Sequence, residues 1–165
     1  MSTNTTILTQ QSIAQKIKRM AYQIAENNTD QTKLILAGIL PNGYLIANAL
    51  VPLLTTQHNK QVTVVSVSLN KNNPQLITYT PNITTHGETI IVIDDVSMTG
   101  RTMLYALQPL LALQPNRIQT LVLVERQQKN YPVHSDYVGL HINTTLQNHI
   151  IVAQKNGVLH YAYME

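Results

Sequence analysis

The chain has 165 residues, of which 44% are hydrophobic and 12% are charged, and its formal net charge is +3. It contains no Cys, which excludes disulfides, thiolate zinc sites and cysteine nucleophiles. Lys and Arg are few and spread along the chain, which disfavours a nucleic-acid-binding stripe. The apolar stretches are too short for a membrane helix, and the polar start lacks a secretory pattern. We therefore expect a single cytoplasmic domain over residues 1–165.

The first half of the chain alternates between two hydrophobic patterns. Residues 10–27 have apolar side chains at spacings of three and four, which predicts an amphipathic helix, and residues 44–54 repeat this pattern. Residues 33–39 and 61–69 are short apolar runs, which predict strands buried on both faces. Residues 70–87 are rich in Asn, Thr and Pro, and this composition predicts an exposed loop or hairpin.

The second half continues the alternation. Residues 89–93 and 120–124 predict buried strands, and residues 102–113 predict a helix between them. Shorter strands are expected at 137–142 and 150–153, and the turn signal at 155–157 predicts a C-terminal hairpin. Strands that alternate with helices indicate an α/β fold with an open, mostly parallel, doubly wound sheet. Such sheets bind ligands at the carboxyl ends of their strands.

The most informative segment joins the strand at 89–93 to the helix at 102–113. Asp94 and Asp95 stand side by side at the end of this strand. The following residues offer hydroxyl groups, a flexible backbone or positive charge: Ser97, Thr99, Gly100, Arg101 and Thr102. A strand that ends at a helix N-terminus leaves unpaired backbone N–H groups, which together with such side chains can hold a phosphate.

Two carboxylates beside a phosphate site need partners of their own. Sugar hydroxyls and a hydrated divalent cation are the natural ones. Because neighbouring side chains of a strand point to opposite faces, Asp94 and Asp95 can share a ligand only if the strand stops between them. The alternative interpretation is a capped helix beside a surface acidic pair, which a bare Asp-Asp would favour but the whole pattern does not.

Residues 94–102 resemble the binding motif for 5-phosphoribosyl 1-diphosphate (PRPP) in type I phosphoribosyltransferases. Within that family the chain is similar to the pyrimidine-operon attenuation branch, whose members are also uracil phosphoribosyltransferases. The likeness extends to Gly38 and residues 43–47 and to residues 136–139. It implies transfer of ribose 5-phosphate from PRPP to a nucleobase, with uracil favoured and diphosphate released. It also implies Mg²⁺ as cofactor and a homodimer or larger homo-oligomer.

The resemblance assigns roles to individual residues. Asp94 and Asp95 would be the catalytic pair that binds the ribose hydroxyls and, through water and PRPP, Mg²⁺. The residues implied to hold the 5′-phosphate are Ser97, Thr99, Gly100, Arg101 and Thr102. The diphosphate loop would be Leu40, Pro41, Asn42 and Gly43. Lys71 would be the cation of a flexible flap over residues 70–87, and the base would contact Arg126, Tyr137 and Val138.

Departures from the family pattern keep other functions open. The diphosphate loop lacks the two cations of the attenuation branch, so a PRPP- or nucleotide-sensing, RNA-binding regulator of pyrimidine genes with weak or no catalysis is one alternative. A purine phosphoribosyltransferase is another, but Met98 stands where purine-specific relatives carry a proton-handling Asp. A P-loop is excluded because Tyr44 and Leu45 replace its Lys and Ser/Thr after Gly38 and Gly43. The histidines lack metal-ligand spacing.

Overall fold

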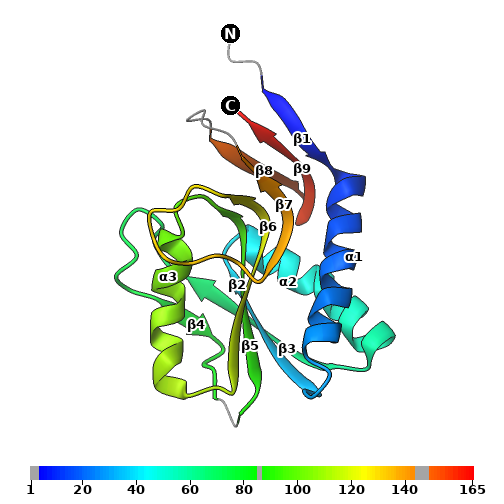
Figure 1. Cartoon of the computed structure of the whole chain (residues 1–165), viewed down its shortest axis with the longest axis vertical. Helices are drawn as coiled ribbons and strands as arrows, with labels where there is room; N and C mark the ends of the chain where they lie inside the picture. Colours follow the sequence, from blue (N-terminus) through cyan, green and yellow to red (C-terminus); the bar gives the residue numbers. More distant parts are fainter. Residues whose placement is uncertain (1–3, 85–86, 144–148) are drawn as a thin grey trace.

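The computed structural model describes residues 4–84, 87–143 and 149–165. Its larger sheet, the core sheet, has six strands in the order β4-β3-β2-β5-β6-β7 (Figure 1). The parallel strands are β2 (Lys33–Ile39), β3 (Gln61–Ser68), β5 (Thr89–Ser97), β6 (Arg117–Arg126) and β7 (Tyr137–Ile142). The short strand β4 (Thr78–Thr80) pairs antiparallel with β3. The predicted α/β fold with a mostly parallel sheet is confirmed.

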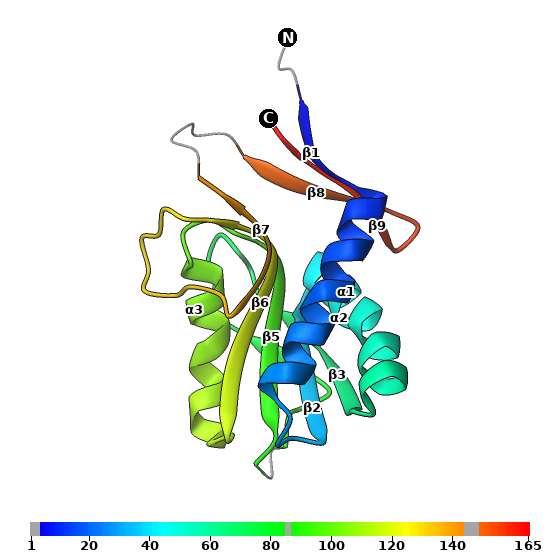
Figure 2. The same cartoon turned by 45° about the vertical axis from the view of Figure 1, so that its right-hand side comes forward.

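A second, antiparallel sheet lies above the carboxyl ends of the core sheet and is called the hood here. It consists of β1 (Thr5–Thr9), β9 (Val158–Met164) and β8 (Ile150–Lys155), in that order. Figure 2 shows the hood as a separate layer across the top of the core sheet. The turn between β8 and β9 has positive φ angles at Asn156 (53°) and Gly157 (75°), which confirms the predicted C-terminal hairpin.

Helices cover both faces of the core sheet. The helices α1 (Gln10–Asn27) and α2 (Asn42–Pro52) lie on one face and α3 (Arg101–Leu107) on the other (Figures 1 and 2). A π-helical segment, Leu53–Gln57, continues α2, and a 3₁₀ segment, Gln108–Leu113, continues α3. No helix among the described residues is long and apolar enough to cross a membrane.

Two apolar clusters explain why the central strands are hydrophobic throughout. On β2, Leu34 and Leu36 belong to the cluster that includes α1 and α2, whereas Ile35 and Ala37 belong to the cluster that includes α3. This is the alternation expected of a strand with helices on both sides. Burial on both faces holds the strands in a fixed register, so their carboxyl ends form a rigid platform.

Three differences from the prediction affect the surroundings of the carboxyl ends. β5 continues through Asp94 and Asp95 to Ser97 instead of ending at residue 93. β1 was not predicted, because a five-residue strand that pairs with β9 at the far end of the chain has no local signature. The outer part of residues 70–87 is docked on the core: the Tyr79 hydroxyl donates to the Ala106 carbonyl of α3, and Ile83 is buried. Among the described residues of this segment, Lys71 lies over the carboxyl end of β5, beside Asp94.

Candidate active site

A pocket of about 360 Å³ lies between the carboxyl end of β5 and the hood. The start of α2, the segment around Lys71, residues 94–103 and the β8 residues Ile150–Val152 line it. It brings together most of the predicted site residues: Asn42, Lys71, Asp94, Asp95, Ser97, Thr99, Gly100, Arg101 and Thr102. The sequence motif and a docked flap segment therefore share one cavity.

A close contact between α2 and β5 forms one wall of the pocket. A Cβ atom on Gly43 would lie 2.2 Å from the Ile93 carbonyl oxygen, so only glycine lets α2 start this close to the end of β5. The preceding residue, Asn42, donates from Nδ2 to Asp95 Oδ2 at 2.7 Å and to the Val152 carbonyl at 2.9 Å. Asn42 thus connects the predicted diphosphate loop with the acidic pair and the hood.

The other residues of that loop do not line the pocket. The Leu40 N–H donates to the Val67 carbonyl at 2.9 Å, and the Leu40 side chain is 41% exposed. Pro41 is exposed, and Gly43 is buried against β5. Within the described chain, Asn42 is the one member of the predicted diphosphate loop that lines the pocket.

Asp94 and Asp95 reach the same cation although both lie in β5. Lys71 Nζ is 2.9 Å from Asp94 Oδ1 and 3.5 Å from Asp95 Oδ1. The expectation that the strand must stop between them is wrong, because both carboxylates approach Lys71 while each turns toward the backbone N–H of the following residue. Asp94 Oδ1 accepts from the Asp95 N–H, and Asp95 Oδ1 accepts from the Val96 N–H, both at 2.9 Å. The two carboxylates can therefore share a ligand.

The burial of Asp94 favours a positively charged partner beside the acidic pair. Burial and the neighbouring Asp95 carboxylate raise the pKa of Asp94 to about 7, against the opposing effect of Lys71. Burial also disfavours the charged form of Lys71, but the two carboxylates outweigh it and raise the pKa of Lys71. A cation beside this pair is therefore favoured strongly.

The loop after β5 is braced from behind by the segment that follows β6. Thr99 Oγ1 accepts from the Arg101 N–H at 3.2 Å, and the Thr99 carbonyl accepts from the N–H groups of Asn130 and Tyr131 at 3.1 and 3.0 Å. Gly100 has a φ of 83°, and a Cβ atom there would lie 3.2 Å from the Tyr131 carbonyl oxygen. The loop therefore keeps one conformation, with its other side toward the pocket.

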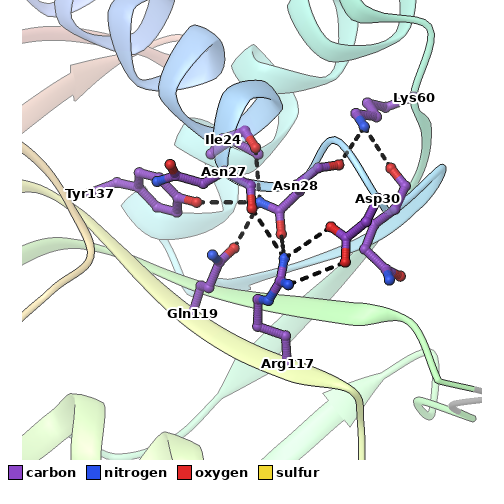
Figure 3. Close-up of polar contacts among 9 residues, drawn as sticks. Ile24, Asn27, Asn28, Asp30, Lys60, Arg117, Gln119 and Tyr137 are labelled. Carbon is purple, nitrogen blue, oxygen red and sulfur yellow. Dashed lines mark hydrogen bonds and ion pairs between the residues drawn. The ribbon is translucent and has the colours of Figure 1, made fainter.

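The three residues expected to contact the base lie elsewhere. Tyr137 is 1% exposed, and its hydroxyl accepts from Asn28 Nδ2 at 3.3 Å beside the C-terminal end of α1 (Figure 3). The Val138 side chain packs in the cluster on the α3 face, and Arg126 is half-buried at the end of β6. Tyr137 does not line the pocket, since it is buried in the apolar cluster that includes α1 and α2.

Tyr137 instead belongs to a structural cluster of polar groups around Asn28. Besides the Tyr137 hydroxyl, Asn28 Nδ2 contacts the Ile24 carbonyl and Gln119 Oε1, at 2.8 and 2.9 Å (Figure 3). Asn28 Oδ1 accepts from Arg117 at 2.8 Å. This cluster ties the end of α1 to β6 and β7, and it lies toward the amino ends of the strands.

Two features of the site were not predicted from the sequence. β8 was predicted as a strand, but nothing in its sequence indicated that Ile150–Val152 would cover the pocket. Lys129 contacts Ser97 from the loop after β6, with Nζ 2.6 Å from Ser97 Oγ. A lone lysine in a polar loop carries no signal of such a contact.

The acidic pair is the group that could hold a metal ion. The described residues contain no cluster of three or more His, Cys, Asp or Glu side chains that could enclose one. Asp94 and Asp95 do supply hard oxygen donors at one point of the pocket. Mg²⁺ is commonly held by one or two carboxylates together with substrate phosphates, so these residues fit it.

An open parallel sheet with paired acids and a hydroxyl-rich loop at the carboxyl end of one strand defines a class of proteins that bind sugar phosphates. The family model described as "Phosphoribosyl transferase domain" matches residues 3–155. The chain belongs to this family, and the predicted class of activity, phosphoribosyl transfer, is confirmed at the family level.

Particular relatives and structures agree with this assignment. The Bifunctional protein PyrR of Streptococcus pneumoniae (strain CGSP14) is 32% identical over 148 residues, covering 86% of this chain and 84% of the relative. That of Halalkalibacterium halodurans is 31% identical over 157 residues, covering 88% and 87%. The hypoxanthine phosphoribosyltransferase of Trypanosoma cruzi matches with a TM-score of 0.80 at 18% identity, covering 98% of this chain and 97% of that one, and so shares the fold.

Proposed function

We propose that the chain transfers ribose 5-phosphate from PRPP to uracil and releases diphosphate. The observation that carries this proposal is the shared pocket, in which the buried Asp94 and the partly exposed Asp95 lie beside the residues from Ser97 to Thr102. Pocket walls come from the core sheet and from the hood, which supports treating residues 1–165 as one catalytic domain.

The acidic pair would bind the ribose hydroxyls. Asp94 and Asp95 point at one cation position, so they also fit Mg²⁺ held through water and PRPP. Bound there, Mg²⁺ would offset the negative charge of the diphosphate. The loop residues that would hold the 5′-phosphate are Ser97, Thr99, Gly100, Arg101 and Thr102.

Stabilisation of the leaving diphosphate would depend on Lys71. The predicted diphosphate loop has no cation, and Asn42 is its contribution to the pocket. Lys71 lines the same pocket and is 44% exposed, so its ammonium can turn from the carboxylates to the diphosphate. Reaction through an oxocarbenium-like transition state then requires mainly positioning and exclusion of water by the segment around Lys71 and by the hood.

The edge of β8 supports a pyrimidine-dione as the base. His149 and Glu165 exchange backbone hydrogen bonds at 3.1 Å, so the backbone groups of Ile150 and Val152 point away from β9. The Val152 carbonyl does accept from Asn42 on that side. The Ile150 N–H, the Ile150 carbonyl and the Val152 N–H thus form a donor–acceptor–donor row, which complements the acceptor–donor–acceptor edge of uracil.

Met98 supports the same choice. It lines the pocket and can neither donate nor accept a proton, which disfavours chemistry at a purine ring nitrogen. This arrangement gives Arg126 and Val138 no role in base binding. We assign the contact with the base to β8 instead of β7.

A regulatory, RNA-binding activity is the second candidate, and the name of the two relatives, Bifunctional protein PyrR, favours a second activity beside transfer. Lys16, Lys18 and Arg19 form a small basic cluster on α1. It offers little for RNA binding, because Arg19 donates to the carbonyls of Val138 and Gly139 at 2.9 and 2.8 Å. That contact leaves Lys16 and Lys18 in the cluster. Binding to a pyrimidine leader transcript with a steep salt dependence would establish this activity. Self-association and a cytoplasmic location remain predictions.

The direct test incubates the protein with Mg²⁺, PRPP and one base at a time, and detects nucleotide by chromatography. We expect UMP from uracil and much less product from hypoxanthine or guanine. The matched control is the D94N/D95N variant, which should form none. Absence of nucleotide with every base would remove the enzymatic proposal.

A further inference from the structure

Lys129 is a buried lysine that contacts Ser97, the last residue of β5. Its side chain is 5% exposed, and Nζ lies 2.6 Å from Ser97 Oγ, 3.1 Å from the Ser97 carbonyl and 3.3 Å from Glu125 Oε1. An ammonium has three donors, and these three acceptors use all of them. Lys129 is therefore held in one position, and two of its three contacts are to Ser97.

The contact determines what the Ser97 hydroxyl can do. A lysine ammonium can only donate, so it occupies an acceptor lone pair of Ser97 Oγ. The hydroxyl hydrogen must then be directed away from Lys129, and Ser97 lines the pocket. We propose that Lys129 is a positioning residue that makes the Ser97 hydroxyl a donor to an anionic group in the pocket. Identifying that group as the 5′-phosphate rests on the proposed function.

The burial of the Lys129–Glu125 pair supports a role for Lys129 beyond structural support of the loop after β5. Glu125 is 3% exposed and also accepts from the Ser135 N–H at 3.0 Å. Burial lowers the pKa of Lys129, opposed by Glu125. A buried ion pair contributes little net stability compared with apolar side chains of similar size. The loop is already held by the two N–H groups on the Thr99 carbonyl, so the charge acts chiefly on Ser97.

A double-mutant cycle tests this role with ribose 5-phosphate as the probe and calorimetry as the readout. K129M should weaken binding about tenfold, as expected for a charge-assisted hydrogen bond, and S97A should weaken it to a similar extent. Adding K129M to S97A should cost less than about twofold more, because the hydroxyl to be oriented is then missing. The matched control is K155M, at the exposed turn of the hood, which should bind like the wild type.

Further variants guard against misfolding. K129M leaves the Glu125 carboxylate buried without its ammonium partner, so E125Q/K129M, which removes both charges, is measured beside it. Equal tenfold losses from K129M with and without S97A would indicate plain structural support and overturn the proposal. Unchanged affinity in S97A overturns it without any substitution at Lys129.

Binding measurements on the wild type distinguish a failure of this proposal from a failure of the proposed function. If it binds neither ribose 5-phosphate nor PRPP, the proposed function fails. If it binds both while a folded E125Q/K129M variant binds equally well, only the role of Lys129 fails.

Discussion

Replacing Asp94 with Asn is expected to stabilise the protein above pH 7 while weakening its affinity for PRPP. Asp94 is 2% exposed, and burial and Asp95 raise its pKa from 3.8 to about 7. A difference of about three pKa units corresponds to about 4 kcal/mol, and this is the upper limit of the cost of keeping Asp94 ionised in the fold. The variant also loses the contact with Lys71, which is 44% exposed and can be solvated instead. We therefore expect a gain of about 2–4 kcal/mol at pH 8.

The pH dependence of this gain follows from where the proton is held. The unfolded chain releases the Asp94 proton near pH 3.8, whereas the folded chain holds it up to about pH 7. The wild type therefore loses stability as the pH rises between these two values, and below them the proton is bound in both states. Asn does not titrate, so the stability advantage of the variant over the wild type should increase from pH 3.8 to about pH 7 and stay constant at higher pH.

Urea unfolding in EDTA at pH 4 and pH 8 measures the effect. D30N is the matched control: Asp30 is exposed, and its hydrogen bond with Arg117 lowers its pKa, so its removal should cost stability at pH 8 rather than add it. A D94N variant that is less stable than the wild type at pH 8, or whose gain is equal at both pH values, would refute the argument from burial. Calorimetry with Mg²⁺ and PRPP should show at least a tenfold weaker affinity.

Three other substitutions test the site and its support. G43A should lower the free energy of unfolding by about 2 kcal/mol in urea titrations, because its methyl group would meet the Ile93 carbonyl. Y137F should cost about 1 kcal/mol by the same measurement and leave the KM for uracil unchanged; a raised KM would restore Tyr137 to the base site. K71M should raise the KM for PRPP about tenfold or more in steady-state assays, and wild-type kinetics would exclude Lys71 from diphosphate binding.

Local patterns predicted the platform of the site well. The observed boundaries of β2, β7 and α1 agree with those predicted from their apolar residues. Burial on one or two faces determines the spacing of apolar residues, so these boundaries can be predicted locally. The segment 94–102 predicted the acidic pair and the loop because both lie in one continuous stretch. The sequence could therefore specify the part of the pocket that one strand and its loop build.

The rest of the pocket depends on long-range placement. β1 and β9 pair across almost the whole chain, and their pairing brings Ile150–Val152 over the pocket. Tyr137 was assigned to the base from its neighbours in sequence, but the face it takes on β7 is set by packing against α1. Lys129 reaches Ser97 only because the ends of β5 and β6 lie side by side, with Ser97 paired to Glu125.

The charges in the pocket explain how a loop without cations could still serve phosphoribosyl transfer. Ionised Asp94 is costly in its buried position, and in this structure Lys71 compensates both carboxylates. In the proposed function the carboxylates would bind the sugar and its metal ion, so that this compensation would come from the substrate side and Lys71 would become available to the diphosphate. Leu40 and Pro41 do not line the pocket, whereas Lys71 does and contacts both carboxylates. The predicted diphosphate loop therefore needs no cation of its own. Lys71, on a separate segment, would neutralise the acidic pair first and the leaving diphosphate afterwards.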